Sequence, residues 1–285
     1  MTAKKIIVGY DRSADSKAAA AWALDEAART GAVVEFFFAY EWPSWAPAVS
    51  TIAAPPVWPG GETDRAVNGM LDEAVTTARL THPEVRTRIS IERASAAGAL
   101  VERSTEAGLI VLGSRGHSDV TGLLGSVSVA VSAHASCPVT VVRGDARATA
   151  PIVVGIDGSE SAQSALAYAA ELADARGVPL RVIHARTPVS SPWEVTPGAV
   201  ATDPESDRAP LAELLVGWQE KYPQLEIVPE LAVEHPAAAL TAASATAQML
   251  VVGTRGRGAV RGMLLGSVSQ HLLRHSATTV AVVHS

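Results

Sequence analysis

Short apolar runs alternate with longer helix-forming stretches along this chain. Runs rich in β-branched and aromatic residues predict strands at residues 4–10, 33–39, 109–112 and 138–142, and an alternating segment predicts another at residues 85–91, with Ile89 and Ile91 facing inward. Stretches rich in helix formers predict helices between Ser13 and Gly31 and at residues 63–80, 97–107 and 126–136. Strands that alternate with helices indicate an α/β fold with a parallel sheet and right-handed crossovers.

Two of the predicted helices carry further signals. Ser13 stands where an N-cap is expected, and Gly31 stands where a helix would end. The helix at residues 63–80 gathers apolar side chains on one face, formed by Met70, Leu71, Ala74, Val75 and Ala78. We expect that face to be buried.

The same pattern restarts after residues 144–150, which are small and polar and predict a linker. Strands are expected at residues 152–157, 227–233, 249–252 and 279–283, and a helix at residues 237–247. The distance from Asp11 to Gly31 equals that from Asp157 to Gly177, so the first strand and helix of each half match without a gap. We therefore predict two domains, residues 1–143 and 151–285, each an open five-stranded parallel sheet in the order 3-2-1-4-5 with helices on both faces. Proline-rich connectors interrupt each half, at residues 40–61 and 188–204.

Composition and charge narrow the class of protein. Of the 285 residues, 48% are apolar and 18% are charged, which is enough for buried cores, and the net charge of -6 argues against duplex nucleic acid as the main partner. The lone cysteine, Cys137, excludes an internal disulfide, fits a reducing cytosol and is expected to be buried. No apolar run is long enough for a signal peptide or a membrane span, so we expect a cytoplasmic protein without a membrane partner.

The candidate chemistry concentrates in two glycine-rich segments. Residues 250–269 read LVVGTRGRGAVRGMLLGSVS, and residues 110–128 read IVLGSRGHSDVTGLLGSVS. In each, an apolar strand breaks into a glycine loop and restarts as a helix, an arrangement whose backbone N–H groups can surround a phosphate. The glycines are expected to adopt positive φ angles, and Ser267 is expected at the N-cap of the following helix.

An aspartate should face each glycine loop. Asp11 and Asp157 end the first strand of each half, whereas the loops follow the fourth strand. Ligands of open parallel sheets bind beyond the carboxyl ends of the strands where the winding reverses, and the first and fourth strands are neighbours at that point. The loops are not the dinucleotide fingerprint, which follows a first strand, and they lack the GK[ST] ending of a P-loop.

With these residues the chain resembles a tandem universal stress protein. Nucleotide-binding members of that family carry Gly, two residues, Gly, nine residues, and then Gly followed by Ser or Thr. The second half has this motif at Gly253, Gly256, Gly266 and Ser267, and the first half has it at Gly113, Gly116, Gly125 and Ser126, with eight residues in place of nine. The resemblance covers nearly the whole chain apart from the two proline-rich connectors.

The resemblance implies that the clefts bind ATP or a related adenine nucleotide, commonly with Mg²⁺ or Mn²⁺ held mainly by phosphate oxygens. Asp11 and Asp157 would lie beside the nucleoside or its metal-phosphate group, and Ala39 and Ala185 would line the adenine pocket. The ribose and phosphates would be held by Gly113, Gly116, Gly125, Ser126, Val127 and Ser128 in the first half, and by Gly253, Arg255, Gly256, Gly266, Ser267, Val268 and Ser269 in the second. Of these, Val127, Ser128, Val268 and Ser269 would donate N–H or hydroxyl groups.

Simpler interpretations of the same residues stay open. Glycines after a strand can be turn formers only, and the aspartates can cap the helices that follow. The loop arginines Arg255, Arg257 and Arg261 can be solvated surface, and Trp42 can seal a surface instead of stacking on adenine. His271 and His275 stand four residues apart, but no third ligand and no HExxH arrangement accompanies them, so no metal site is predicted.

Three classes of function follow. The first is an adenine-nucleotide-binding protein of stress response or growth control. The second is a weak ATPase or nucleotidyl-transfer enzyme, although no His or Lys stands beside either aspartate as a base or nucleophile. The third is an interaction scaffold without nucleotide. Because the second loop has the full spacing and more arginines, we expect the second cleft to hold a triphosphate more tightly.

The resemblance also implies an assembly. In the family the fifth strands pair across a dimer, so the two halves should pack as an intramolecular pseudo-dimer, and two chains should form a homodimer. A regulatory protein partner is expected, but the sequence does not identify it.

Overall fold

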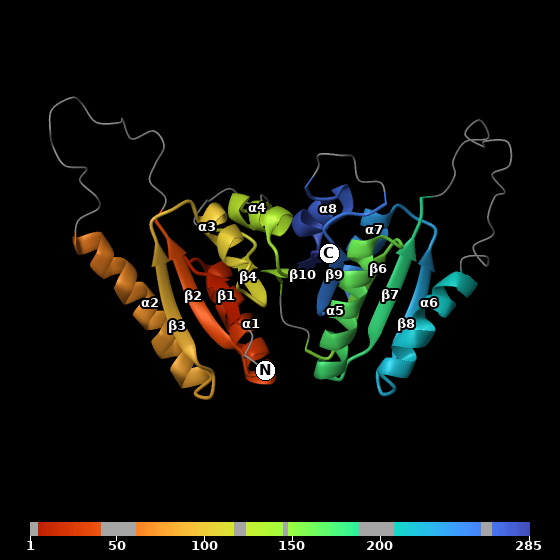
Figure 1. Ribbon diagram of the computed structural model, residues 1–285, viewed down its shortest axis with the longest axis horizontal. Coiled ribbons are helices and arrows are strands. Elements are labelled where there is room, and N and C mark those ends of the chain that lie inside the picture. The colour runs from red at the N-terminus through yellow and green to blue at the C-terminus, as the bar shows by residue number, and fades with distance from the viewer. Residues whose placement is uncertain (1–4, 41–60, 117–123, 145–147, 188–207, 258–263) are drawn as a thin grey trace, which may run out of the picture. The chain divides into compact units, whose positions relative to one another are not determined.

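The computed structural model describes residues 5–40, 61–116, 124–144, 148–187, 208–257 and 264–285. The chain divides into two compact units, Met1–Val142 and Arg143–Ser285. Figure 1 shows the first unit in red to yellow-green and the second in green to blue.

The first unit is a doubly wound α/β domain. Its elements are β1 (Lys5–Gly9), α1 (Ala14–Thr30), β2 (Val33–Ala39), α2 (Gly61–Thr81), β3 (Thr87–Glu92), α3 (Ala96–Arg103), β4 (Leu109–Gly113), α4 (Ser126–His134) and β5 (Val139–Val142). The strands pair in parallel in the order β3-β2-β1-β4-β5. This confirms the predicted order 3-2-1-4-5, although α3 and α4 end earlier than the sequence pattern suggested.

The second unit repeats the design. Its elements are β6 (Ile152–Ile156), α5 (Glu160–Arg176), β7 (Leu180–Ala185), α6 (Arg208–Lys221), β8 (Ile227–Ala232), α7 (Pro236–Ser244), β9 (Met249–Gly253), α8 (Ser267–His275) and β10 (Thr279–Val283). Its strands are parallel in the order β8-β7-β6-β9-β10. Helix α6 was not predicted, because its apolar side chains do not form one stripe: Leu215 is buried, whereas Leu214 and Val216 are exposed.

The first helix of each unit begins after a capping serine and ends at a left-handed glycine. The Ser13 side chain caps α1 by accepting a hydrogen bond from the Ser16 N–H at 3.1 Å, and Ser159 caps α5 in the same way. Gly31 and Gly177 end the two helices in the left-handed conformation, with φ of 68° and 61°. The predicted capping positions of α1, Ser13 and Gly31, are therefore confirmed. The capping serines determine where the helices begin after β1 and β6.

The core of the first unit fills the space between the sheet and the α1 and α2 face. Leu71 and Phe36 are fully buried there, and the predicted apolar face of α2 packs against the sheet. On the other sheet face, a Cβ on Gly9 would lie 2.6 Å from Leu112 and 3.7 Å from Leu100 of α3, so that helix packs directly on the backbone. Of the two β3 side chains expected to face inward, Ile91 packs against the core on the α1 and α2 face, whereas Ile89 is 38% exposed because β3 is an edge strand of the unit.

Candidate functional site

Each unit has a cleft at the carboxyl ends of its first and fourth strands. The cleft of the second unit has a volume of about 430 Å³, and that of the first about 310 Å³. The structure brings every predicted site residue to one of these clefts. The first is lined by Asp11, Ala39, Gly113, Gly116, Gly125, Ser126, Val127 and Ser128, and the second by Asp157, Ala185, Gly253, Arg255, Gly256, Gly266, Ser267, Val268 and Ser269.

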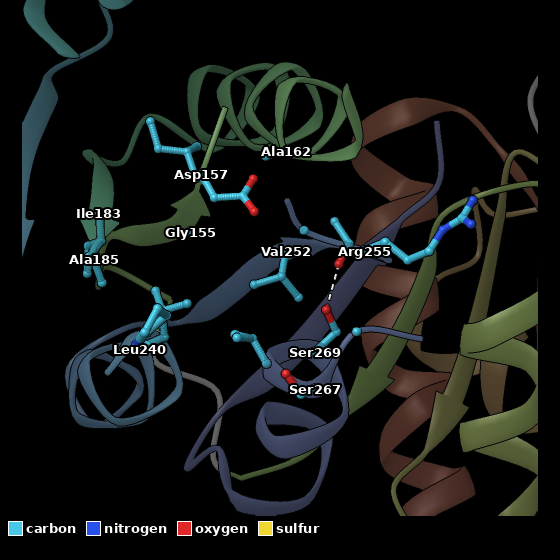
Figure 2. A pocket seen from close by; sticks show the side chains of 16 residues that line it. Gly155, Asp157, Ala162, Ile183, Ala185, Leu240, Val252, Arg255, Ser267 and Ser269 are labelled. Carbon is cyan, nitrogen blue, oxygen red and sulfur yellow. Dashed lines mark hydrogen bonds between the residues drawn. The ribbon is translucent and has the colours of Figure 1, made fainter. Parts of the chain in front are cut away.

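Asp157 joins the end of β6 to the glycine loop. Its Oδ1 accepts hydrogen bonds from the main-chain N–H of Ser159 at 3.0 Å and from the Ser159 hydroxyl at 2.6 Å. Its Oδ2 accepts one from the main-chain N–H of Arg257 at 2.8 Å. Figure 2 shows this carboxylate on one side of the cavity, with Ser267 and Ser269 on the other.

The hydrogen bonds keep Asp157 ionised. Burial alone raises the pKa of its carboxyl group, but the hydrogen bonds from Ser159 and Arg257 and the positive charge of Arg257 outweigh burial and hold the pKa below its usual value. The group is thus a fixed negative charge at neutral pH. Such a carboxylate is a good hydrogen-bond acceptor and a poor general base.

Asp11 makes the equivalent turn in the first unit, where its Oδ1 accepts from the Ser13 N–H at 2.9 Å. In both units the residue after the aspartate is left-handed, with φ of 69° at Arg12 and 78° at Gly158. The serine that follows each of them is the helix cap. Each aspartate therefore supports the capping residue and is not itself the cap.

The described loop glycines are needed for close approach, and the prediction of positive φ angles was wrong for Gly253, Gly256 and Gly266; Gly258 and Gly262 lie outside the described residues. Within the described residues, positive φ in glycine occurs only at Gly31, Gly144, Gly158 and Gly177. A Cβ on Gly253 would instead lie 2.7 Å from the main-chain carbon of Ser161, and a Cβ on Gly256 would overlap Oδ2 of Asp157. In the first unit a Cβ on Gly116 would lie 2.9 Å from Oδ2 of Asp11. The glycines let the loop lie directly against the aspartate turn.

Main-chain and serine hydrogen bonds close the base of each loop. The Gly266 N–H donates to the Thr254 carbonyl at 2.7 Å, and the Gly125 N–H donates to the Ser114 carbonyl at 2.9 Å. The buried hydroxyl of Ser269 donates to the Gly253 carbonyl at 2.7 Å (Figure 2), as that of Ser128 does to the Gly113 carbonyl at 2.8 Å. These two hydroxyls thus donate within the loop itself, which leaves the main-chain N–H groups of Ser128 and Ser269 as the predicted donors to a ligand.

The helices that follow the loops begin without a capping side chain. The N-cap residues are Gly125 and Gly266, so the prediction that Ser267 is the N-cap was wrong by one position. Neither glycine can cap, whereas α1, α5 and α7 are each capped by a side chain. The first-turn N–H groups of α8, at Ser267, Val268 and Ser269, belong to residues that line the cleft. An uncapped helix N-terminus favours an anion at this end of the cleft.

The opposite end of each cleft is apolar, and sequence analysis found only one residue of it per unit. Beside Ala185 lie Ile156, Ala162, Ile183, Pro236, Leu240 and Val252, and beside Ala39 lie Tyr10, Phe37, Phe38, Ala96, Leu100 and Leu112. Figure 2 shows Ile183, Ala185 and Leu240 together at one side. Strand periodicity was the available signal, because Phe37 and Ile183 precede the two alanines by two positions and share their sheet face.

Other candidates have less support in the structure. The rings of His271 and His275 lie 4.4 Å apart between centroids, and within the described residues no group of three or more His, Cys, Asp or Glu could hold a metal ion. Trp42 and Arg261 lie outside the described residues. None of the described helices is both long and apolar enough to span a membrane.

Fold and clefts together define a class: a protein of two doubly wound α/β domains, each with a glycine loop after its fourth strand that faces an aspartate after its first. The Universal stress protein family model matches residues 2–143 and 149–284. The chain belongs to the universal stress protein family.

Relatives in this family match the chain over nearly its full length. A universal stress protein of Mycobacterium tuberculosis is 36% identical over 295 residues, which cover 98% of this chain and 96% of that protein. One of Mycolicibacterium smegmatis is 34% identical over 301 residues, with the same two coverages of 98% and 96%. The crystal structure of a universal stress protein from Archaeoglobus fulgidus superposes with a TM-score of 0.72 at 20% identity, covering 99% of this chain and 96% of that one, which supports the fold.

Proposed function

We propose that the protein binds adenine nucleotides, ATP first among them, in the two clefts and acts as a regulator in stress response. One observation carries the proposal: the uncapped N-terminus of α8 and the ionised Asp157 line one cleft that is apolar at its other end. The apolar end suits a purine base, and the helix N-terminus suits phosphates. Asp157, between these ends, suits the ribose hydroxyls.

The residues present fit a phosphorylated ligand. The uncapped first turn of α8 offers main-chain N–H groups to phosphate oxygens, and the glycines at 253 and 256 let the loop pack against Ser161 and Asp157 beside it. A divalent cation would be held mainly by the phosphate oxygens of the ligand. Mg²⁺ or Mn²⁺ would neutralise the polyphosphate charge next to Asp157.

Mass spectrometry of small molecules released from gently purified protein tests the proposal. We expect an adenine nucleotide in near-stoichiometric amount, and calorimetric titration of stripped protein should show saturable binding of ATP. Protein that carries no nucleotide and gives no binding signal with millimolar ATP, ADP or AMP would contradict the proposal. ATP turnover well above background that Asp157→Asn abolishes would instead favour an enzyme, although the lowered pKa of Asp157 makes it a poor base.

We also propose that the two clefts bind the nucleotide with unequal affinity. The second has the larger volume and the full nine-residue spacing, so it should hold the triphosphate more tightly. A pseudo-dimer of the two halves, a homodimer of chains, a regulatory protein partner and a cytoplasmic location stay predictions of this proposal. Light scattering at micromolar concentration tests the homodimer, and a strict monomer would contradict it.

A further inference from the structure

The first turns of α1 and α5 each carry one acidic residue, Asp15 and Glu160, but at different positions. Asp15 on α1 accepts two hydrogen bonds at its Oδ2, from the Ser114 hydroxyl at 2.6 Å and from Arg115 Nε at 3.2 Å. The matching residue of α5 is Ser161, whose hydroxyl donates to the main-chain carbonyl of Arg255. Arg115 and Arg255 occupy equivalent positions in the two loops, and both line their clefts.

The cleft arginine is therefore held by a carboxylate in the first unit only. In the described part of the chain, no carboxylate pairs with the Arg255 guanidinium. Figure 2 shows its long side chain extending away from Asp157. An exposed guanidinium on a flexible stem can turn toward a bound phosphate, whereas Arg115 must first leave Asp15.

Asp15 is ionised at neutral pH and thus keeps its hold on Arg115. Burial raises the pKa of its carboxyl group, but the hydrogen bonds from Ser114 and Arg115 and the arginine charge bring the pKa below its usual value. The carboxylate also adds a negative charge beside the loop, which disfavours each further phosphate.

A second arginine, Arg257, adds to the difference between the two clefts. The side chain of Arg257 lies over Gly158, where a Cβ would come within 2.8 Å of its Nη2. In the first unit Arg12 replaces that glycine, and its guanidinium pairs with Glu73 of α2 at 3.7 Å. The space that admits Arg257 beside Asp157 thus exists because residue 158 lacks a side chain.

We propose that Asp15 and Ser161 set the phosphate selectivity of the two clefts. The second cleft gains affinity as phosphates are added to the adenine nucleotide, and the first binds mono- and triphosphates about equally. The smaller volume of the first cleft, about 310 Å³ against 430 Å³, points the same way. This inference rests on the proposed adenine-nucleotide binding and assigns Asp15 as a specificity-determining residue.

The negative charge of Glu160 would reduce the difference in phosphate selectivity between the two clefts, and this residue provides a control. Glu160 adjoins Ser161 in the first turn of α5, but its side chain is exposed. A solvated carboxylate that pairs with neither arginine is largely screened. Glu160→Gln should therefore leave the ratio of ATP to AMP affinity unchanged within about twofold, as expected for an exposed charge.

The experiment measures that ratio in each cleft separately, by calorimetric titration of the full chain with ATP and AMP. Gly256→Ala weakens the second cleft and Gly116→Ala the first, and each background is used only where titration shows a stoichiometry of one nucleotide per chain. Asp15→Ser should raise the ratio of the first cleft about three- to fivefold, since one exposed charge pair contributes up to about 1 kcal/mol and 1.4 kcal/mol is tenfold. Ser161→Asp should lower the ratio of the second cleft by a similar factor.

Matched variants separate charge from shape. Asp15→Asn removes the charge at constant size and should act like Asp15→Ser, whereas Ser161→Asn adds size without charge and should leave the ratio unchanged. Asp25→Ser removes a carboxylate about 15 Å further along α1, from a rise of about 1.5 Å per residue, and should also leave it unchanged.

The outcomes distinguish the two proposals. If both nucleotides bind but neither Asp15→Ser nor Asp15→Asn changes the ratio, the inference is overturned and nucleotide binding stands. Equal changes from Asp15→Ser and Asp25→Ser would also overturn it, because they would show a general charge effect. If no nucleotide binds in either background or in the parent chain, the proposed function itself fails.

Discussion

Oδ2 of Asp157 accepts a hydrogen bond at 2.8 Å from the main-chain N–H of Arg257, 100 residues later in the chain. This bond joins the turn after the first strand of the second unit to the loop after its fourth strand. The loop can approach so closely only because its neighbouring residue, Gly256, has no side chain. The aspartate therefore shapes the loop as well as facing the cleft.

Gly256→Ala should weaken nucleotide binding to the second cleft. The new Cβ would overlap Oδ2 of Asp157, so either the carboxylate or the loop must move. We expect a loss of about tenfold or more, since displacing a charge-assisted hydrogen bond costs about 1.5 to 3 kcal/mol. Isothermal calorimetry with ATP measures the loss.

A second glycine provides the control for that change. Gly217 lies on α6, and a Cβ there would meet no atom within 4 Å, so Gly217→Ala should leave ATP binding unchanged. Gly116→Ala is the counterpart in the first cleft, with a milder approach of 2.9 Å to Asp11. A larger loss of total ATP binding from Gly116→Ala than from Gly256→Ala would contradict the predicted dominance of the second cleft.

Asp157→Asn should destabilise the fold at neutral pH but not in acid. The pKa of Asp157 is lower in the folded protein than in the unfolded chain, so its ionised form stabilises the fold at pH above the unfolded value of about 3.9. That stabilisation is lost as the pH falls through the folded pKa. Urea unfolding at pH 7 and at pH 3 should show a gap between parent and variant that closes in acid. Asp174→Asn, an exposed change on helix α5, which follows the Asp157 turn, should show no such gap at pH 7.

Two leucines of α2 should differ sharply on truncation. Leu71 is fully buried against the sheet, so Leu71→Ala should reduce the free energy of unfolding by about 2 to 5 kcal/mol. Leu80 is 81% exposed on the same helix, and Leu80→Ala should change that free energy by less than about 0.5 kcal/mol. The denaturant midpoints of the two variants and the parent protein, measured by circular dichroism, test this difference. Equal effects would show that α2 does not pack on the sheet by its predicted face.

Cys137 should resist alkylation in the folded protein. It is buried, and burial raises the pKa of its thiol to about 11, so the reactive thiolate is nearly absent at pH 8. Iodoacetamide should leave the native chain unmodified at pH 8 and pH 9 and should label it fully in denaturant. Rapid labelling of the native protein at pH 8 would show that the segment between α4 and β5, which carries this residue, opens.

The fold was predictable because the two halves confirm each other. The matched spacing from Asp11 to Gly31 and from Asp157 to Gly177 fixed the repeat, and the structure shows Gly31 and Gly177 ending equivalent helices. What the pattern missed depends on tertiary position. The exposure of Ile89 follows from the place of β3 at the edge of its unit, which alternation of apolar residues does not reveal.

Sequence analysis identified the parts of the candidate site but not how they fit. It brought Asp157 and the glycine loop to one cleft through strand order, yet it assigned the glycines to positive φ instead of to close approach. The pairing of Asp15 with Arg115 was not predictable, because the two residues lie on different elements and each is common on a surface. Only the folded arrangement shows that Ser161 leaves the equivalent arginine without that carboxylate.

The hydrogen bonds that close the loop bases have an evolutionary consequence. Gly125 to Ser114 and Gly266 to Thr254 are bonded alike, although the first loop is one residue shorter than the second. Insertions and deletions between these bonded ends can accumulate without shifting the strand or the helix on either side. After duplication, the loop of one copy could thus change length while both copies kept the same fold.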